Sequence, residues 1–306
     1  MAIEEFDGLP LHLADWTYET IVNLVKTRDF EDDTLDYKAV LNPTSENNDY
    51  KKDHRDSIRR TVCSMANTSG GFIIFGVKDQ KNTTGGTDSL EDRICGVPLG
   101  GELLKDFGEK IAVLQPHVHF EPIPQAIPIP DKQGKGVFVV YIPQSQRRPH
   151  MVFFEGGSGG IYYRRGEHGA AEPMTHNEVR DQMVYTEDRI KKVTLLRLEL
   201  MQYKEIANIA QAQMTWALDR FDVSAFKVLL AEVCSLIPQN LLRKALDIPR
   251  QATKINRRLD DIYKQDLARI GGGIVPDIER DFRVFIDLCD ECEKALENDF
   301  GSLGIG

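Results

Sequence analysis

The sequence predicts an α/β domain followed by an all-α region. Up to about residue 186, short β-type runs alternate with segments of helical periodicity. Beyond this point apolar residues keep a helical spacing, and no further proline occurs before Pro238. The chain shows no internal repeat, and its 306 residues suffice for two ordinary domains. We therefore expect an α/β domain at residues 1–186 and a helical domain at residues 187–306.

Helix, strand and turn signals follow one another in a clear order in the first half. The predicted elements are a helix at 15–27, a strand at 34–41, a polar loop at 42–53, a helix at 55–65, and strands at 72–77, 136–143 and 159–166. Asp15 or Thr17 can cap the first helix. In the first strand apolar residues alternate with Asp36 and Lys38, so these two charged residues share one face.

The strand at residues 72–77 is an almost unbroken apolar run, which predicts burial on both faces. Gly70 and Gly71 precede it and allow a tight turn or a close backbone approach. Asp79 follows at the point where the strand leaves the core. We expect a central strand that delivers one acid to the edge of a sheet.

The second half is predicted to be helical throughout. The expected helices cover residues 178–222, 223–236, 239–246, 250–268 and 276–299. The segment GGGIVP at residues 271–276 predicts a break between the last two.

Composition is typical of a soluble globular protein, with 41% hydrophobic and 28% charged residues. No apolar run approaches 18 residues, and the first residues lack the basic and apolar regions of a secretory signal. The five cysteines are scattered and form no disulfide framework. These features predict a cytoplasmic protein without a membrane span.

The net charge of −10 argues against a protein that coats nucleic acid through bulk positive charge. The charge is nevertheless uneven along the chain. Residues 132–165 contain six basic residues and only one acid, whereas the segment from Asp277 onward contains nine acids. A local basic face is therefore compatible with the acidic total, although a solvated surface explains each run equally well.

Several sequence motifs that often mark a metal, nucleotide or catalytic site are absent here or lack the neighbouring residues that such a site requires. Cys289 and Cys292 form a CxxC inside a predicted helix, with no second pair of ligands, so two packed or half-exposed thiols are expected. His117 and His119 share a strand face, but no carboxylate accompanies them, and a structural role is favoured. The chain contains no P-loop, no GxGxxG fingerprint and no GxSxG elbow.

Acids near the first two strands form the best candidate site. Glu31 follows the first helix, Asp36 lies on the next strand, and Asp79 follows the central strand. Lys38 stands about 7 Å from Asp36 along the same strand face. If the strands are neighbours, the carboxylates and the lysine converge, and a hard cation such as Mg²⁺ or Mn²⁺ relieves the repulsion. Metal ion and lysine together suit phosphodiester cleavage.

Several segments of the chain resemble the Schlafen AlbA_2-type domain. They are IVNLVKTRDFEDDTLDYKAVL (21–41), MANTSGGFIIFGVKD (65–79), ICGV (94–97), VYIPQSQRRPHMV (140–152) and IYYRRGEHGAAEPMTHNEV (161–179). They occur in the order of the family's motifs, and the resemblance covers roughly residues 15–186. It implies a mixed-sheet α/β domain of the bacterial type.

RNA-cleaving Schlafen proteins use two Glu and one Asp as a metal-dependent nuclease site, with a lysine nearby. Glu31, Asp36, Lys38 and Asp79 match this pattern by position. The resemblance therefore implies an endoribonuclease that cleaves structured RNA, above all tRNA, with Glu31, Asp36 and Asp79 binding Mg²⁺ or Mn²⁺. The second acid is Asp instead of Glu, so the metal must lie nearer the backbone or be held through water.

Arginines of the first half are candidates for phosphate contacts that do not read sequence. The candidates are Arg55, Arg59, Arg60, Arg147, Arg148, Arg164 and Arg165. The Schlafen nuclease core has two related lobes, whereas this chain has one. We therefore expect two copies to pair as a homodimer, with the helical region as the contact surface.

Two other functions remain open at this stage. The first is a regulatory module that binds DNA, RNA or nucleotide without cutting, and the second is an interaction protein that acts through its helical region. The acids favour the nuclease, because a simple phosphate binder gains nothing from carboxylates that repel its ligand.

Overall fold

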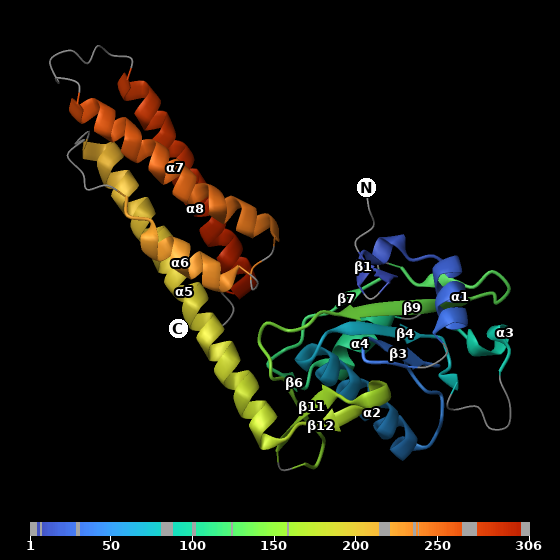
Figure 1. The fold of residues 1–306 in the computed structure, drawn as a ribbon. Coiled ribbons are helices and arrows are strands. Elements are labelled where there is room, and N and C mark those ends of the chain that lie inside the picture. Colours follow the sequence, from blue (N-terminus) through green and yellow to red (C-terminus); the bar gives the residue numbers. More distant parts are fainter. Residues whose placement is uncertain are drawn as a thin grey trace. The chain divides into compact units, whose positions relative to one another are not determined.

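The computed structural model divides the chain into two compact units, Met1–Met183 and Val184–Gly306 (Figure 1). The residues that it describes are 5–6, 8–28, 31–80, 88–99, 102–123, 125–157, 159–213, 221–234, 237, 239–264 and 274–300. The first unit is α/β and the second is helical, so the predicted fold class is confirmed. The division lies close to the predicted change at residue 186.

The first unit is built on a six-stranded mixed sheet in which β3, β4 and β9 lie side by side (Figure 1). Its strands are β3 (Leu35–Lys38), β4 (Gly71–Phe75), β5 (Val97–Pro98), β7 (Glu121–Pro122), β8 (Ile127–Pro128) and β9 (Lys135–Ile142). β3 runs parallel to β4, and β4 runs antiparallel to β9. All residues of β4 are buried, as predicted for a central strand, and Phe72 and Phe75 are among the largest side chains of the core.

A second, antiparallel sheet has the order β12-β11-β10-β6. Its strands are β6 (Leu114–Gln115), β10 (Met151–Phe153), β11 (Gly160–Arg165) and β12 (Ala171–Pro173). A short hairpin pairs β1 (Glu5–Phe6) with β2 (Leu9–Pro10). The predicted strand at 159–166 is thus β11, whereas β6, β10 and β12 are too short to give a clear periodic signal.

Helix α2 (Asn48–Asn67) contacts β9 of the first sheet and β10, β11 and β12 of the second. At its end the Asn67 side chain donates to the carbonyl oxygens of His150 and Tyr163, each at 2.9 Å, and accepts from the His150 N–H. This buried amide fastens α2 to β11 and to the residue before β10. The other helices of the unit are α1 (Tyr18–Thr27), α3 (Leu90–Arg93) and α4 (Leu103–Ile111).

The helix boundaries confirm one prediction and correct another. α1 begins after Thr17, whose side chain forms a capping box with Thr20, as the sequence indicated. α2 begins earlier than predicted, inside the expected polar loop at 42–53. The reason is local, because the Asn47 side chain accepts hydrogen bonds from the Asp49 and Tyr50 N–H groups and so starts the helix.

The Gly70–Gly71 turn permits close backbone contacts between strands. Gly70 has φ +80°, and a Cβ there would stand 2.7 Å from the Ile142 carbonyl oxygen. A Cβ at Gly71 would stand 2.6 Å from the Thr34 carbonyl oxygen. Both positions therefore require glycine for β4 to sit between β3 and β9.

The second unit contains four helices among its described residues, and no strand occurs there. They are α5 (His176–Gln213), which starts in the first unit, α6 (Ser224–Val233), α7 (Gln239–Lys264) and α8 (Ile274–Phe300). α7 passes through Pro249 and so joins two helices that were predicted as separate. Burial of Ala245, Ile248 and Ala252 around the proline stabilises the continuous helix despite the lost hydrogen bond.

Parts of the predicted helices and of the 271–276 break lie outside the described residues. In the described part of α8, Cys289 and Cys292 are free and buried among apolar residues. Burial raises the pKa of the Cys289 thiol to about 12 and that of Cys292 to about 11, so both are inert packed thiols, as expected. None of the helices that the structure describes is long and apolar enough to cross a membrane.

Candidate active site

The two parallel strands bring three of the predicted side chains to one cavity. Asp36 pairs with Ile73 and Lys38 with Phe75, so β3 and β4 end at the same edge of the sheet. Lys38 closes β3, Asp79 follows β4, and Glu31 precedes β3. Glu31, Lys38 and Asp79 line a cavity of about 440 Å³ at this edge. The two strands are therefore neighbours, which was the condition for the predicted site.

Asp36 lies below this cavity and is only 2% exposed, although the alternating pattern placed it on a polar face. Its Oδ1 accepts a hydrogen bond from Lys38 Nζ, and its Oδ2 accepts one from Thr61 Oγ1 of α2 at 2.9 Å. Arg165 Nη1 stands 3.5 Å from Oδ2. Burial alone would raise the pKa of Asp36, but the neighbouring Lys38 and Arg165 lower it, so the residue is a carboxylate.

Lys38 places its ammonium group between two acids. Besides its hydrogen bond to Asp36, Nζ stands 3.7 Å from Glu31 Oε1. Burial alone would lower the pKa of Lys38, but Asp36 and Glu31 raise it above the ordinary value. The lysine is therefore a fixed positive charge in the floor of the cavity.

Glu31 is held by the Tyr37 N–H, which donates to Oε1 at 3.1 Å. Burial raises its pKa to about 7, with further contributions from the negative charges of Asp36 and Asp79. The attraction of Lys38 and the Tyr37 hydrogen bond offset only part of this shift. A perturbed carboxyl in a cavity is a feature of functional sites, because its charge is costly until a ligand compensates for it.

Fewer carboxylates are available to bind a divalent cation than the three that the sequence predicted. No group of three His, Cys, Asp or Glu side chains within the described part of the chain could hold a metal ion. In addition, Lys38, Thr61 and Arg165 already engage both oxygens of Asp36. Glu31 and Asp79 remain in the larger cavity, and Mg²⁺ is commonly held by one or two carboxylates together with substrate phosphate.

Two of the seven predicted phosphate contacts are wrong, because their side chains are buried in internal hydrogen bonds. Arg59 is 4% exposed, donates to the Lys110 carbonyl oxygen at 2.8 Å and pairs with Asp56 at 3.0 Å. Arg165 donates to the carbonyl oxygens of Asp32 at 2.8 Å and Leu35 at 3.1 Å while it faces Asp36. Arg165 is thus a positioning residue for the segment that carries Glu31 and Asp36.

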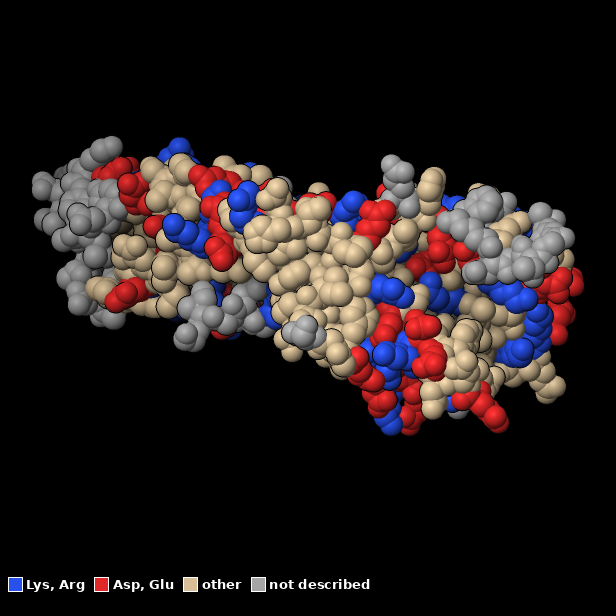
Figure 2. Space-filling view, turned by 90° about the horizontal axis from the view of Figure 1, so that it is seen from below, with Lys and Arg blue, Asp and Glu red and all other residues tan. Residues whose placement is uncertain are grey.

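The remaining arginines differ in how far their charge is already compensated. Arg55 pairs with Glu155 at 2.9 Å, and Arg164 pairs with Glu172 at 2.8 Å and Glu178 at 3.0 Å. Arg147 and Arg148 are half-buried. On the face of the α/β unit in Figure 2, basic and acidic atoms are interleaved, and no continuous basic area is visible there.

Arg60 has the best position among the predicted phosphate contacts. It lies on α2 and lines a second cavity of about 190 Å³, which Glu31, Asp36 and Lys38 also line. Its guanidinium group therefore belongs to the same site as the acids, which suits a contact to a phosphate that lies beside them.

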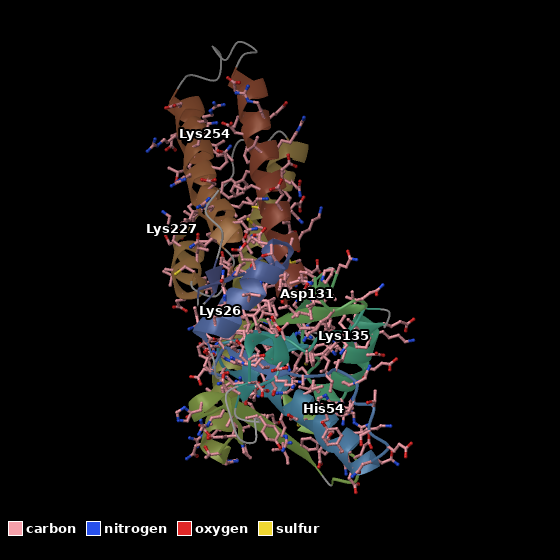
Figure 3. All side chains as sticks on the ribbon, turned by 90° about the vertical axis from the view of Figure 1, so that its right-hand side faces the viewer. Lys26, His54, Asp131, Lys135, Lys227 and Lys254 are labelled. Carbon is pink, nitrogen blue, oxygen red and sulfur yellow. The ribbon has the colours of Figure 1, made fainter. Side chains whose placement is uncertain are left out.

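One face of α2 contributes further residues that the sequence reasoning missed. Tyr50, His54, Ser57 and Thr61 recur at helical spacing and line the two cavities. His54 lies on α2 in Figure 3. Burial and the nearby Lys38 lower the pKa of His54. The spacing was present in the sequence, but residues 48–53 of this helix, which include Tyr50, were predicted as a loop.

Comparison with known proteins identifies the family of the domain that contains this site. The family model described as Schlafen, AlbA_2 matches residues 31–171, a range that starts at Glu31 and extends through β11 to the first residue of β12. No curated protein matches the chain. A domain of this family indicates a function related to nucleic acids. The protein therefore carries a Schlafen AlbA_2 domain.

Proposed function

We propose that the protein is a metal-dependent endoribonuclease that cleaves structured RNA, with tRNA as the main substrate. The observation that carries this proposal is the shared cavity of Glu31, Lys38 and Asp79, with Asp36 fixed beneath it. An acid of raised pKa, Glu31, beside the fixed positive charge of Lys38 suits phosphodiester chemistry better than neutral ligand binding.

Each side chain of the site has a distinct role in the proposed reaction. Lys38 stabilises the negative charge that develops on the scissile phosphate. Asp36 holds the Lys38 ammonium group in place, and Thr61 and Arg165 in turn hold Asp36. Arg60 contacts the phosphate backbone next to the reacting group.

Glu31 and Asp79 would hold the divalent cation, Mg²⁺ or Mn²⁺, while Asp36 holds the Lys38 ammonium group beside them. When bound, the cation supplies positive charge for the phosphate and promotes the ionisation of the attacking water. It would also favour the charged form of Glu31, whose pKa of about 7 reflects its burial first and then the negative charges of Asp36 and Asp79.

A second function is favoured by one specific observation. Both oxygens of Asp36 are engaged by neighbouring side chains, as expected if the pocket only binds phosphate through Lys38 and Arg60. Under this alternative the protein is a non-catalytic module that holds nucleic acid or a nucleotide. Pairing of two copies as a homodimer would widen the binding groove under either function.

Cleavage assays test the proposal directly. Purified protein is incubated with a tRNA pool and with single- and double-stranded DNA, each with Mg²⁺, Mn²⁺ or EDTA. We expect tRNA cleavage that requires metal and that falls at least about 100-fold in Glu31→Gln and Asp79→Asn, because each removes a charged ligand. Asp131→Asn changes an exposed acid outside the two cavities (Figure 3) and serves as the matched control.

The outcomes separate the two functions. Metal-dependent cleavage that both site variants lose supports the nuclease. Tight RNA binding by the wild type without cleavage in any metal favours the non-catalytic module. Cleavage by Glu31→Gln and Asp79→Asn at the wild-type rate would contradict the proposed site.

A further inference from the structure

The wall of the active-site cavity opposite the strand ends is aromatic. α2 contributes Tyr50, His54 and Ser57 to this wall, whereas the charged side chains come from the segment before β3, from the end of β3 and from the segment after β4. The Tyr50 and His54 rings lie one helical turn apart, with centroids 6.4 Å from each other and planes inclined by 24°. The proposed cleavage reaction has no use for these two rings.

The aromatic wall is accessible. Tyr50 is 51% exposed, an unusual degree for a large ring in a cavity that also holds buried charges. Burial and Lys38 lower the pKa of His54, so its ring is uncharged at neutral pH. A nearly parallel pair of uncharged rings, one of them open to solvent, is the kind of surface on which a nucleobase stacks.

The size and charge of the cavity suit one nucleotide. Its volume of about 440 Å³ falls within the range of roughly 300–1,000 Å³ that small-molecule sites occupy. Lys38 and Lys78 provide cations for phosphate on the strand side, and α2 provides the rings. A nucleotide carries these two kinds of group, an anionic phosphate and a flat base.

We propose that Tyr50, supported by His54, is a stacking platform for one unpaired base of the RNA that lies next to the reacting phosphate. This inference rests on the proposed function and specifies its substrate. A base inside a duplex is covered on both faces by its neighbours, so it cannot reach Tyr50. The site thus selects a loop, bulge or single-stranded end beside the cleavage position.

Binding of RNA hairpins in EDTA tests the platform without any cleavage. Three labelled, blunt-ended hairpins share one stem that is closed by a loop of abasic residues, so the loop offers no base: the stem of the first is fully paired, that of the second has a single-nucleotide bulge, and that of the third has an abasic residue at the bulge. The wild type is expected to bind the bulged hairpin roughly 5- to 100-fold more tightly than the other two, in line with the contribution of one stacked base.

Substitutions of Tyr50 then test whether its aromatic ring causes the preference for the bulged hairpin. Tyr50→Leu should remove it and Tyr50→Phe should retain it, because stacking needs the ring and not the hydroxyl. Phe153→Leu removes a partly exposed ring on β10, outside the cavity, and should leave the preference unchanged. Tyr50 is half-exposed, so the fold should tolerate these substitutions. The comparison of the three hairpins with wild-type protein does not depend on any variant.

Equal binding of the three hairpins by the wild type, or an undiminished preference in Tyr50→Leu, would overturn the platform. Cleavage of the same hairpins with Mn²⁺ is scored separately. A bulge preference without cleavage would retain the platform and reject the nuclease. Cleavage without a preference would retain the nuclease and reject the platform.

Discussion

At the scale of single residues, the site depends on how one buried acid is compensated. Asp36 contacts a lysine, an arginine and a threonine, and each contact comes from a different part of the chain. At Glu31 the attraction of Lys38 and the Tyr37 hydrogen bond offset only part of the cost of burial, and the pKa of this carboxyl is raised to about 7. Two acids that are five positions apart in sequence therefore have opposite electrostatic environments.

The raised pKa of Glu31 predicts a pH-dependent gain in stability for Glu31→Gln. Folding raises this pKa from 4.5 to about 7, so the folded state binds more protons than the unfolded state between these values. Stability therefore falls as the pH rises through this window. Glu31→Gln should raise the free energy of unfolding by up to about 3 kcal/mol at pH 8, but by at most about 1 kcal/mol at pH 5.

Urea unfolding at the two pH values measures this effect. Glu109→Gln, at an exposed position of α4, provides the control and should show no such pH-dependent gain. A gain of equal size at pH 5 and pH 8 would mean that the ionisation of Glu31 is not the cause.

Arg165 and Arg164 are neighbours on β11 and should respond very differently to substitution by methionine. Arg165→Met leaves the buried Asp36 charge without one partner and removes hydrogen bonds to the carbonyl oxygens of Asp32, Asp33 and Leu35, so it should cost about 3–5 kcal/mol. Arg164→Met breaks partly exposed pairs and should cost about 1 kcal/mol or less. Denaturant unfolding of both variants compares them, and equal losses would refute the structural role of Arg165.

At the scale of elements, α2 decides which residues form the site. One of its faces lines the cavities, and its last residue fastens the second sheet. The sequence predicted only the second half of this helix, because the polar run at its start lacks an apolar stripe. The cap at Asn47 extends the helix by the turns that carry Tyr50 and His54.

Arg60 should carry part of the RNA affinity. Its removal in Arg60→Ala should weaken binding to unrelated RNAs alike and reduce the magnitude of the log-log salt slope by roughly 0.7 to 0.9, because one phosphate contact is lost. Arg250→Ala removes an exposed arginine on α7 and is the matched control. Fluorescence anisotropy over a salt series measures both slopes, and an unchanged slope in Arg60→Ala would exclude this contact.

At the scale of the whole molecule, each unit has a hydrophobic core of its own. The first core surrounds β4 and contains Phe72 and Phe75, and the second is formed by the C-terminal helices around Phe226 and Phe285. Asp281 in the second unit is 2% exposed and pairs with Lys254 and Arg258, so even its buried charge is compensated internally.

Separate cores predict that the two units fold independently. A fragment of residues 1–183 should unfold cooperatively and keep the α/β circular dichroism spectrum, and a fragment of residues 184–306 should be helical. Thermal melting of the fragments and of the full chain checks this expectation. A fragment without a cooperative transition would show that its core depends on the other unit.

The sequence by itself determined the division into an α/β half and a helical half and the central strand, and it limited the cap of α1 to Asp15 or Thr17. These features depend on local periodicity and on capping side chains, which any short window of the chain contains. Family spacing also selected Glu31, Asp36, Lys38 and Asp79, and the structure brings three of them to one cavity. Their catalytic role stays a prediction.

Tertiary structure alone decided how these residues are used. Arg59 and Arg165 resemble phosphate ligands in sequence, yet their partners are a carbonyl oxygen 51 positions away and a carboxylate on a strand of the other sheet. Asp36 occupies a polar position of its strand but is covered by Thr61 of α2. Whether a side chain is buried, and which distant residue it pairs with, depends on which helices and strands pack together. These contacts form only when the chain has folded, so a local sequence pattern does not encode them.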